Sequence, residues 1–258
     1  MPRVGRTATA GLACALVPAL LASLAAGCST RRDDLRDAGP TRPPSSAPAT
    51  PAPTGPPDTP EPAPTGSPLP APAPAVIEKP PTTAPVEEPA LRTELLAMLV
   101  QDQAVRTGVA PPGDSRSPDE LAAAWDETDR RHGERMHAVL DEHGWPGWRL
   151  VGSDGAFAAF VLVQHADLDL PLQQRGLELL TAAVGRGDAD PSDLAYLLDR
   201  VRVATGQPQV YGTQWGSDAT GAPAPRTPIE DFERVDVRRA AVGLGTLAAY
   251  LEELAAAS

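Results

Sequence analysis

The distribution of proline decides how much of this chain can fold. Of the 31 prolines in its 258 residues, 19 lie between Pro40 and Pro89. A segment so rich in Pro, Ala, Thr and Ser cannot bury enough apolar surface to offset the entropy lost on ordering it. We therefore divide the chain into an N-terminal segment (1–27), a disordered Pro-rich tether (28–89) and one domain of ordinary size (90–258).

The N-terminal segment has the pattern of a secretory signal peptide. Arg3 and Arg6 precede an apolar stretch over residues 8–22, and small residues follow at 25–27. A transmembrane helix is the alternative, but the apolar stretch is short for a bilayer and an Arg-Arg-Asp-Asp run follows it. The sequence therefore predicts that residues 1–27 are a signal peptide and that the protein is exported.

The end of this segment, Leu24-Ala25-Ala26-Gly27-Cys28, resembles the lipobox of bacterial lipoproteins, with Leu one position earlier than usual. The resemblance implies cleavage before Cys28 and acylation of its thiol, as in palmitate-bearing lipoproteins. Two acyl chains anchor a protein stably, because each buried methylene contributes about 0.8 kcal/mol. The alternative is a plain secreted protein with a leftover thiol. We expect a lipid anchor at Cys28, on the extracytoplasmic face of the bacterial cell membrane.

The tether gives this anchor a long reach. A Pro-rich chain extends by about 3.1 Å per residue, so the tether could span on the order of 150 Å. That length would carry the domain away from the membrane, into or through a cell wall. A PxxP ligand for an SH3-like domain is the alternative use of such a segment.

Beyond residue 90 the pattern predicts an all-α domain, a bundle or array of about six helices. Ser117-Pro118-Asp119-Glu120 has the form of a capping box, and Asp190-Pro191-Ser192-Asp193 starts a second helix in the same way. Residues 156–166 could be a strand, but their length and alanines favour a helix. We expect a short extended segment over 207–215 and helices near 91–106, 118–144, 156–166, 171–185, 190–206 and 236–256.

Charge and cysteine content exclude several functions. From residue 91 onward the chain has 26 acidic residues and 15 arginines, a net charge of −11 that repels nucleic acid. Both cysteines, Cys14 and Cys28, precede the domain, which therefore has no disulfide and no cysteine nucleophile. The chain lacks the nucleotide-binding, serine-hydrolase and HExxH zinc motifs, so we expect no cofactor.

Three histidines on one predicted helix are a weak case for a metal. His132, His137 and His143 are spaced five and six apart, whereas helical ligand pairs need three or four. We expect no metal there and interpret these histidines as part of a solvated, charged helix face.

Two polar segments could form a site. Gln164-His165-Ala166-Asp167 ends a strongly apolar segment, so His165 could be a general base or a ligand-binding imidazole that Asp167 orients. Asp199-Arg200 and the loop with Gln209, Tyr211 and Gln214 could form a hydrogen-bonding wall for a polar ligand. The alternatives are a structural histidine at a helix end and a loop held by its own hydrogen bonds.

A run of short motifs resembles the signature of an uncharacterised bacterial family that is known only as a domain of unknown function. The resemblance covers about residues 91–250 and rests on Gly144-Trp145-Pro146, the segment 164–167, Tyr196-Leu197-Leu198-Asp199-Arg200-Val201, the segment 209–214, and Arg238 with Arg239. It implies that the family's polar signature falls on His165, Asp167, Asp199, Arg200, Tyr211 and Gln214. It brings no activity, so function stays open.

Three hypotheses follow. The domain could be a non-catalytic envelope module that binds a polar ligand, a peptide or a wall component through Asp199, Gln209, Tyr211, Gln214 and Arg238. It could be an extracytoplasmic hydrolase or transferase with His165 as general base, Asp167 orienting it and Arg200 as anion clamp. It could also be a scaffold in which these residues form an internal hydrogen-bond network.

Overall fold

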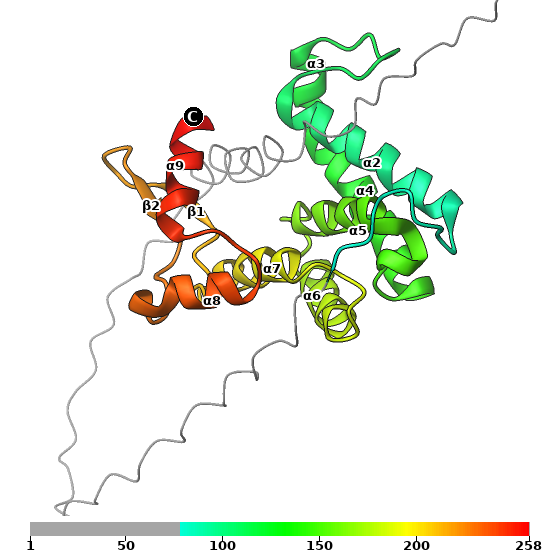
Figure 1. The fold of residues 1–258 in the computed structure, drawn as a ribbon. Coiled ribbons are helices and arrows are strands. Elements are labelled where there is room, and N and C mark those ends of the chain that lie inside the picture. Colours follow the sequence, from blue (N-terminus) through cyan, green and yellow to red (C-terminus); the bar gives the residue numbers. More distant parts are fainter. Residues whose placement is uncertain (1–77, 258) are drawn as a thin grey trace, which may run out of the picture.

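The computed structural model describes residues 78–257 (Figure 1). The predicted signal peptide, Cys28 and most of the predicted tether lie outside the described residues. Within residues 78–257 the chain forms eight α-helices and one two-stranded sheet, which confirms the all-α fold class. In this part of the chain, no helix has the length and apolar character needed to cross a bilayer.

Six helices come first: α2 (Pro89–Thr107), α3 (Pro118–Ala123), α4 (Trp125–His143), α5 (Trp148–Gln164), α6 (Leu170–Gly185) and α7 (Pro191–Ala204). The antiparallel strands β1 (Trp215–Ser217) and β2 (Pro223–Pro225) follow, then the 3-10 turn η2 (Phe232–Arg234), α8 (Val235–Ala241) and α9 (Leu247–Ala257). The predicted capping box is present: the Ser117 hydroxyl accepts from the Glu120 amide, and the Glu120 carboxylate accepts from the Ser117 amide.

Two of the six helices that the sequence predicts are each divided into two shorter helices in the structure. The segment 118–144 divides at Ala124, and the segment 236–256 divides between α8 and α9, where Gly243 has a φ of 79°. The predicted helix 156–166 is confirmed, but it begins earlier, at Trp148, and bends at Gly152, whose φ is 76°. L-residues with side chains rarely adopt a positive φ, so glycine permits the bend at Gly152 and the break at Gly243.

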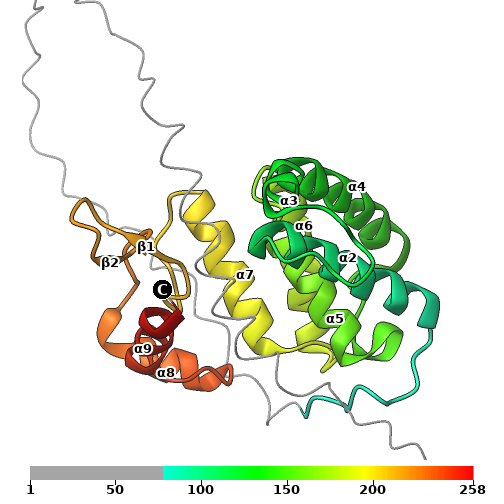
Figure 2. The same cartoon turned by 90° about the horizontal axis from the view of Figure 1, so that it is seen from above.

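Helix α5 is the centre of the core. It packs against α2, α4, α6 and α7, and most of its side chains are buried. Gly176 of α6 allows a close approach, because a Cβ there would lie only 2.6 Å from Cγ1 of Val163. The hairpin, α8 and α9 lie on the opposite side of α7 from α2 and α4 (Figures 1 and 2). Helix α7 therefore joins the core to the C-terminal elements.

Residues 78–88, which we call the strap, lie against the core. The amides of Glu87 and Glu88 donate to the carbonyls of Arg149 and Leu150 at 3.1 and 2.8 Å. The guanidinium of Arg92 donates to the Thr82 carbonyl at 2.8 Å. The domain therefore makes contacts about ten residues before the tether boundary that the sequence predicts.

Candidate functional site

The buried carboxylate of Asp199 holds the loop 207–215. Its Oδ1 accepts from the amide of Val210 at 2.7 Å, and its Oδ2 accepts from the amide and hydroxyl of Thr213 at 3.0 and 3.1 Å. The amide of Tyr211 donates to both oxygens. Burial raises the pKa of Asp199, and these hydrogen bonds oppose the rise. Asp199, predicted to bind a ligand, is an internal anchor in this structure.

Other predicted ligand-binding residues also hold this loop. Gln209 and Gln214 bind each other: the Gln214 amide donates to Gln209 Oε1 at 2.8 Å, and Gln209 Nε2 donates to the Gln214 carbonyl at 2.9 Å. Arg238 Nε donates to the Val210 carbonyl at 2.8 Å. The Tyr211 ring is half-buried, and its backbone carbonyl accepts from Arg239. This is the internal network that the scaffold hypothesis predicts.

Asp167 and Arg200 form a bidentate ion pair that connects this loop to the core. Arg200 Nε and Nη2 donate to the two carboxylate oxygens of Asp167 at 2.9 and 2.6 Å. Arg200 Nη1 donates to Gln214 Oε1 at 3.1 Å, and Gln173 Nε2 donates to Asp167 at 3.2 Å. The structure thus brings together Asp167, Arg200 and Gln214, which lie far apart in the sequence.

His165 has a different partner from the one that the sequence suggests. Its Nδ1 lies 2.9 Å from each carboxylate oxygen of Asp102 in α2, and both side chains are almost fully buried, at 3 % and 1 % exposure. The hypothesis that Asp167 orients His165 is wrong on this point, because the carboxylate of Asp167 binds Arg200. The structure places Asp102 in the orienting position instead.

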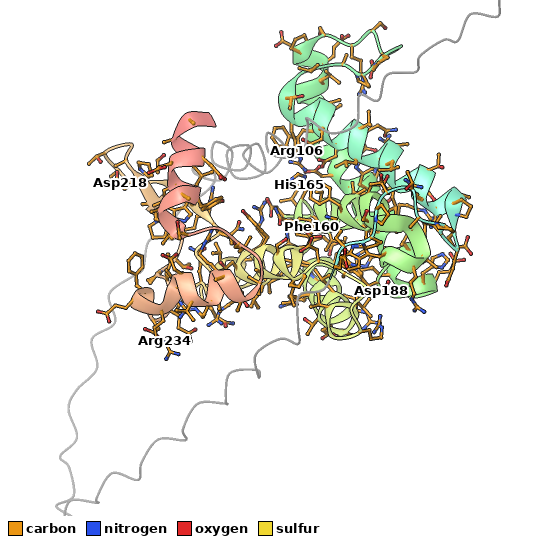
Figure 3. The ribbon with its side chains drawn as sticks, in the orientation of Figure 1. Arg106, Phe160, His165, Asp188, Asp218 and Arg234 are labelled. Carbon is orange, nitrogen blue, oxygen red and sulfur yellow. The ribbon has the colours of Figure 1, made fainter. Side chains whose placement is uncertain are left out.

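The Asp102–His165 pair belongs to a larger group of buried charges, which we call the His165 cluster: His165, Asp102, Arg106 and Asp129. Arg106 donates to Asp102 at 2.9 Å and to Asp129 at 2.7 Å. Trp125 Nε1 also donates to Asp129, at 2.9 Å, and the Arg106 guanidinium lies 4.8 Å from the centre of the Trp125 ring. Arg106 and His165 lie close together where α2 passes α5 (Figure 3).

The pKa values in the cluster favour a neutral imidazole beside an ionised carboxylate. Burial opposes ionisation of Asp102, but its interactions with His165 and Arg106 outweigh burial and lower the pKa of Asp102 to about 2. Burial lowers the pKa of His165; the charge of Asp102 and its hydrogen bond oppose this effect, and the charges of Arg106 and Arg200 add to it. A neutral His165 donates its Nδ1 proton to Asp102 and keeps a lone pair on Nε2. Both contacts of the His165 ring with the Asp102 carboxylate use Nδ1 and not Nε2.

The helical domain matches a known family over nearly its whole length. The model of a family of unknown function (DUF6624) matches residues 89–258. The chain belongs to the DUF6624 family. No curated protein and no solved structure matches it. Membership agrees with the resemblance that the motifs indicate, and it assigns no activity.

In the DUF6624 domain the histidines of α4 do not all face solvent. His132 is only 4 % exposed, and burial lowers its pKa to about 4. Neither of its ring nitrogens has a hydrogen-bond partner in the described part of the chain. His137 is half-exposed and lies 2.8 Å from Asp169. The predicted solvated face is therefore wrong for His132. Across residues 78–257, no three His, Cys, Asp or Glu side chains are grouped to hold a metal ion.

Sequence reasoning missed Asp102, although a local signal for it exists. The buried stripe of α2 runs through Leu91, Leu95, Met98, Asp102 and Val105, with helical spacing throughout. A buried acidic residue in such an apolar stripe needs a hydrogen-bond donor or an opposite charge as its partner. That pattern points to a buried ion pair, but it does not name the partner, which lies 63 residues away.

Proposed function

We propose that the DUF6624 domain of this chain is an extracytoplasmic hydrolase or transferase in which His165 is the general base. The observation that carries the proposal is the contact of His165 Nδ1 with both oxygens of the buried Asp102 carboxylate. A carboxylate that accepts from one ring nitrogen fixes the tautomer and leaves the other nitrogen to take a proton.

The neighbouring residues support particular roles. Asp102 is the positioning residue for His165, in place of Asp167, and Arg106 keeps Asp102 ionised through its own contact at 2.9 Å. Arg200 is close enough for its charge to lower the pKa of His165. A cation near the base would also favour an anionic substrate or an oxyanion that forms during the reaction.

A second candidate is binding of a polar ligand without turnover, such as a peptide or a cell-wall component. Its support is the half-buried Tyr211 on the loop 207–215, which internal hydrogen bonds of Asp199, Gln209 and Gln214 hold in place. A loop held in one conformation can bind a ligand without ordering itself first. In both cases we propose a lipid anchor at Cys28 and no nucleic-acid partner, because the domain carries a charge of −11.

The test is an activity screen of the full-length chain in detergent with p-nitrophenyl acetate, p-nitrophenyl phosphate and a peptide p-nitroanilide. We expect turnover of at least one of them, and His165→Gln should reduce it roughly 10²- to 10⁴-fold, the usual contribution of a general base. Asp102→Asn should also reduce it. The rate should fall on the acid side at a pH below the ordinary histidine value of 6.5, because burial lowers the pKa of His165.

His137→Gln is the matched control, because His137 also lies against a carboxylate, that of Asp169, but is half-exposed. It should keep full activity, and circular dichroism should show each variant folded. Full turnover by a folded His165→Gln would exclude the general-base role. Saturable binding of muramyl dipeptide without turnover of any substrate would favour the second candidate.

A further inference from the structure

A pocket of about 540 Å³ opens on the domain beside α4. One wall is a face of α4 between residues 126 and 134, and the other is the connection between α5 and α6, at Ala166, Leu168 and Asp169. His165 is not among the residues that line it. Of the His165 cluster, Asp129 does line the pocket, but the function proposed above assigns it no role.

The inside of the pocket is mostly apolar, and α4 contributes a glycine, Gly133, to its lining. Gly133 lies in the middle of α4, and a Cβ there would meet only Leu172 at 3.7 Å and Asp169 at 3.9 Å, which are ordinary contacts. The backbone could therefore carry a side chain at this position, and that side chain would occupy the pocket. Leu168, 84 % exposed, forms part of the opposite wall.

The rim of the pocket is strongly acidic. Five carboxyl groups line it, those of Asp126, Glu127, Asp129, Glu134 and Asp169, together with Arg130. Arg130 binds Glu127 at 2.6 Å and also Glu134, Arg106 binds Asp129 at 2.7 Å, and His137 lies 2.8 Å from Asp169. The five carboxyl groups still outnumber the two arginines. The rim therefore has a clear excess of negative charge, on a domain that is itself negative.

We propose that this pocket binds an aliphatic amine, such as the side chain of a lysine-type residue in a peptide. The methylene chain would cover the apolar surface at Gly133 and Leu168, and the ammonium group would meet the carboxylates at the rim. An anionic ligand would be repelled by the rim, and a fully apolar ligand would gain nothing from it. The negative charge of the rim therefore favours a cationic ligand with an apolar chain in this pocket.

Calorimetric titration of the full-length chain with cadaverine, a five-carbon diamine, tests the proposal. Glutarate, which has as many carbons and the opposite charge, is the matched ligand control. We expect saturable binding of cadaverine, binding of glutarate at least about tenfold weaker, and weakening of cadaverine binding as salt is added. The backbone amide of Gly133 should shift in the NMR spectrum on addition of cadaverine.

Gly133→Met should fill the pocket and weaken cadaverine binding at least about tenfold. Asp126→Asn, which keeps the shape of the rim, should weaken binding by a smaller factor and serves as the test if Gly133→Met fails to fold. Asp141→Asn removes one charge from an exposed position of the same helix outside the pocket and should bind as the wild type does. His165→Gln should also bind normally, which separates this site from the proposed catalytic one.

Three results would overturn the proposal. They are no saturable binding of cadaverine at millimolar concentration, equal binding of glutarate, and undiminished cadaverine binding by a folded Gly133→Met variant. Binding that is lost in Asp141→Asn to the same extent as in Asp126→Asn would likewise show that only the overall charge of α4 matters.

Discussion

Two histidines, buried to a similar degree, differ in what surrounds their ring nitrogens. His165 at 3 % exposure faces an ionised partner, Asp102, which Arg106 also contacts. His132 at 4 % exposure has no hydrogen-bond partner for either nitrogen within residues 78–257. A buried polar group without a partner destabilises the fold, because it loses its hydrogen bonds to water and gains none.

We expect His132→Leu to stabilise the domain, and most strongly in acid. Folding lowers the pKa of His132 from 6.5 to about 4, so between those values the unfolded chain takes up a proton that the folded chain does not. Wild-type stability is therefore lost as the pH falls from 6.5 to 4, by roughly 3 kcal/mol at most from this group. Urea unfolding at pH 5 and pH 7.5 should show the variant's advantage growing at pH 5; an equal advantage at both would contradict this account.

At the residue level the sequence identified most members of the polar network but assigned their partners poorly. His165 and Asp167 stand out in the sequence because they end a strongly apolar segment, and Asp199 and Arg200 because they lie near the end of a predicted helix. Their partners depend on how the helices pack. Asp167, between α5 and α6, binds Arg200 of α7, and Asp102 of α2 binds His165 at the end of α5. The local spacing of residues does not contain that information. Asp167, the nearest acidic residue in the sequence, was therefore the wrong partner to predict for His165.

At the scale of elements, the loop 207–215 has almost no regular secondary structure and yet is buried at several positions. A single parallel bridge joins Gln209 to Ile229, and the side chain of Asp199 adds a restraint from the end of α7. Three backbone amides, those of Val210, Tyr211 and Thr213, donate to this one carboxylate, which helps the loop to keep its shape.

Asp199→Ala should therefore lower the free energy of unfolding by about 3 kcal/mol or more, since several buried amide groups lose an ionised acceptor at once. Asp218→Ala is the control: Asp218 accepts from Thr220 and Ala222 amides in the hairpin turn, but it is exposed. Its replacement should change stability much less. Chemical unfolding of both variants measures the difference, and equal losses would mean that burial of Asp199 does not matter.

Helix starts were predicted well and helix breaks poorly, for a physical reason. The starts of α3 and α7 depend on Ser117 and Asp190, whose side chains accept from amides two or three residues later. Such caps are local and can be read from the sequence. The break at Ala124 has no glycine or proline to mark it, whereas Gly243 and Gly245 lie at the break between α8 and α9, which the prediction of one helix over 236–256 overlooked.

At the scale of the whole molecule, the sequence predicts an anchor, a tether and a domain, and the structure describes the domain with its strap. The anchor is a proposal that rests on Cys28 and the residues before it. Acylation of that thiol would keep the protein on the membrane whatever the domain binds, because two acyl chains hold a protein stably.

Cys28→Ser should therefore release the protein from the membrane fraction when it is expressed in a bacterium that processes lipoproteins. Cell fractionation and metabolic labelling with palmitate should show the wild type labelled and sedimenting, and the variant neither. Cys14→Ser is the matched control and should behave as the wild type does. A Cys28→Ser variant that still carries the label would contradict the assignment of the anchor.

The strap contains the one lysine of the chain, Lys79, whose ammonium lies 3.4 Å from Asp190 and faces the ring of Phe157. Its side chain is about half exposed, at 47 %, so an amine-directed dye can reach it. Lys79 thus offers the one side-chain amine for attachment of a fluorophore, at a pH high enough to label lysine as well as the N-terminal amine. Energy transfer from the tryptophans of the core would then report, in an otherwise unmodified chain, whether the strap stays docked when tension is applied to the tether.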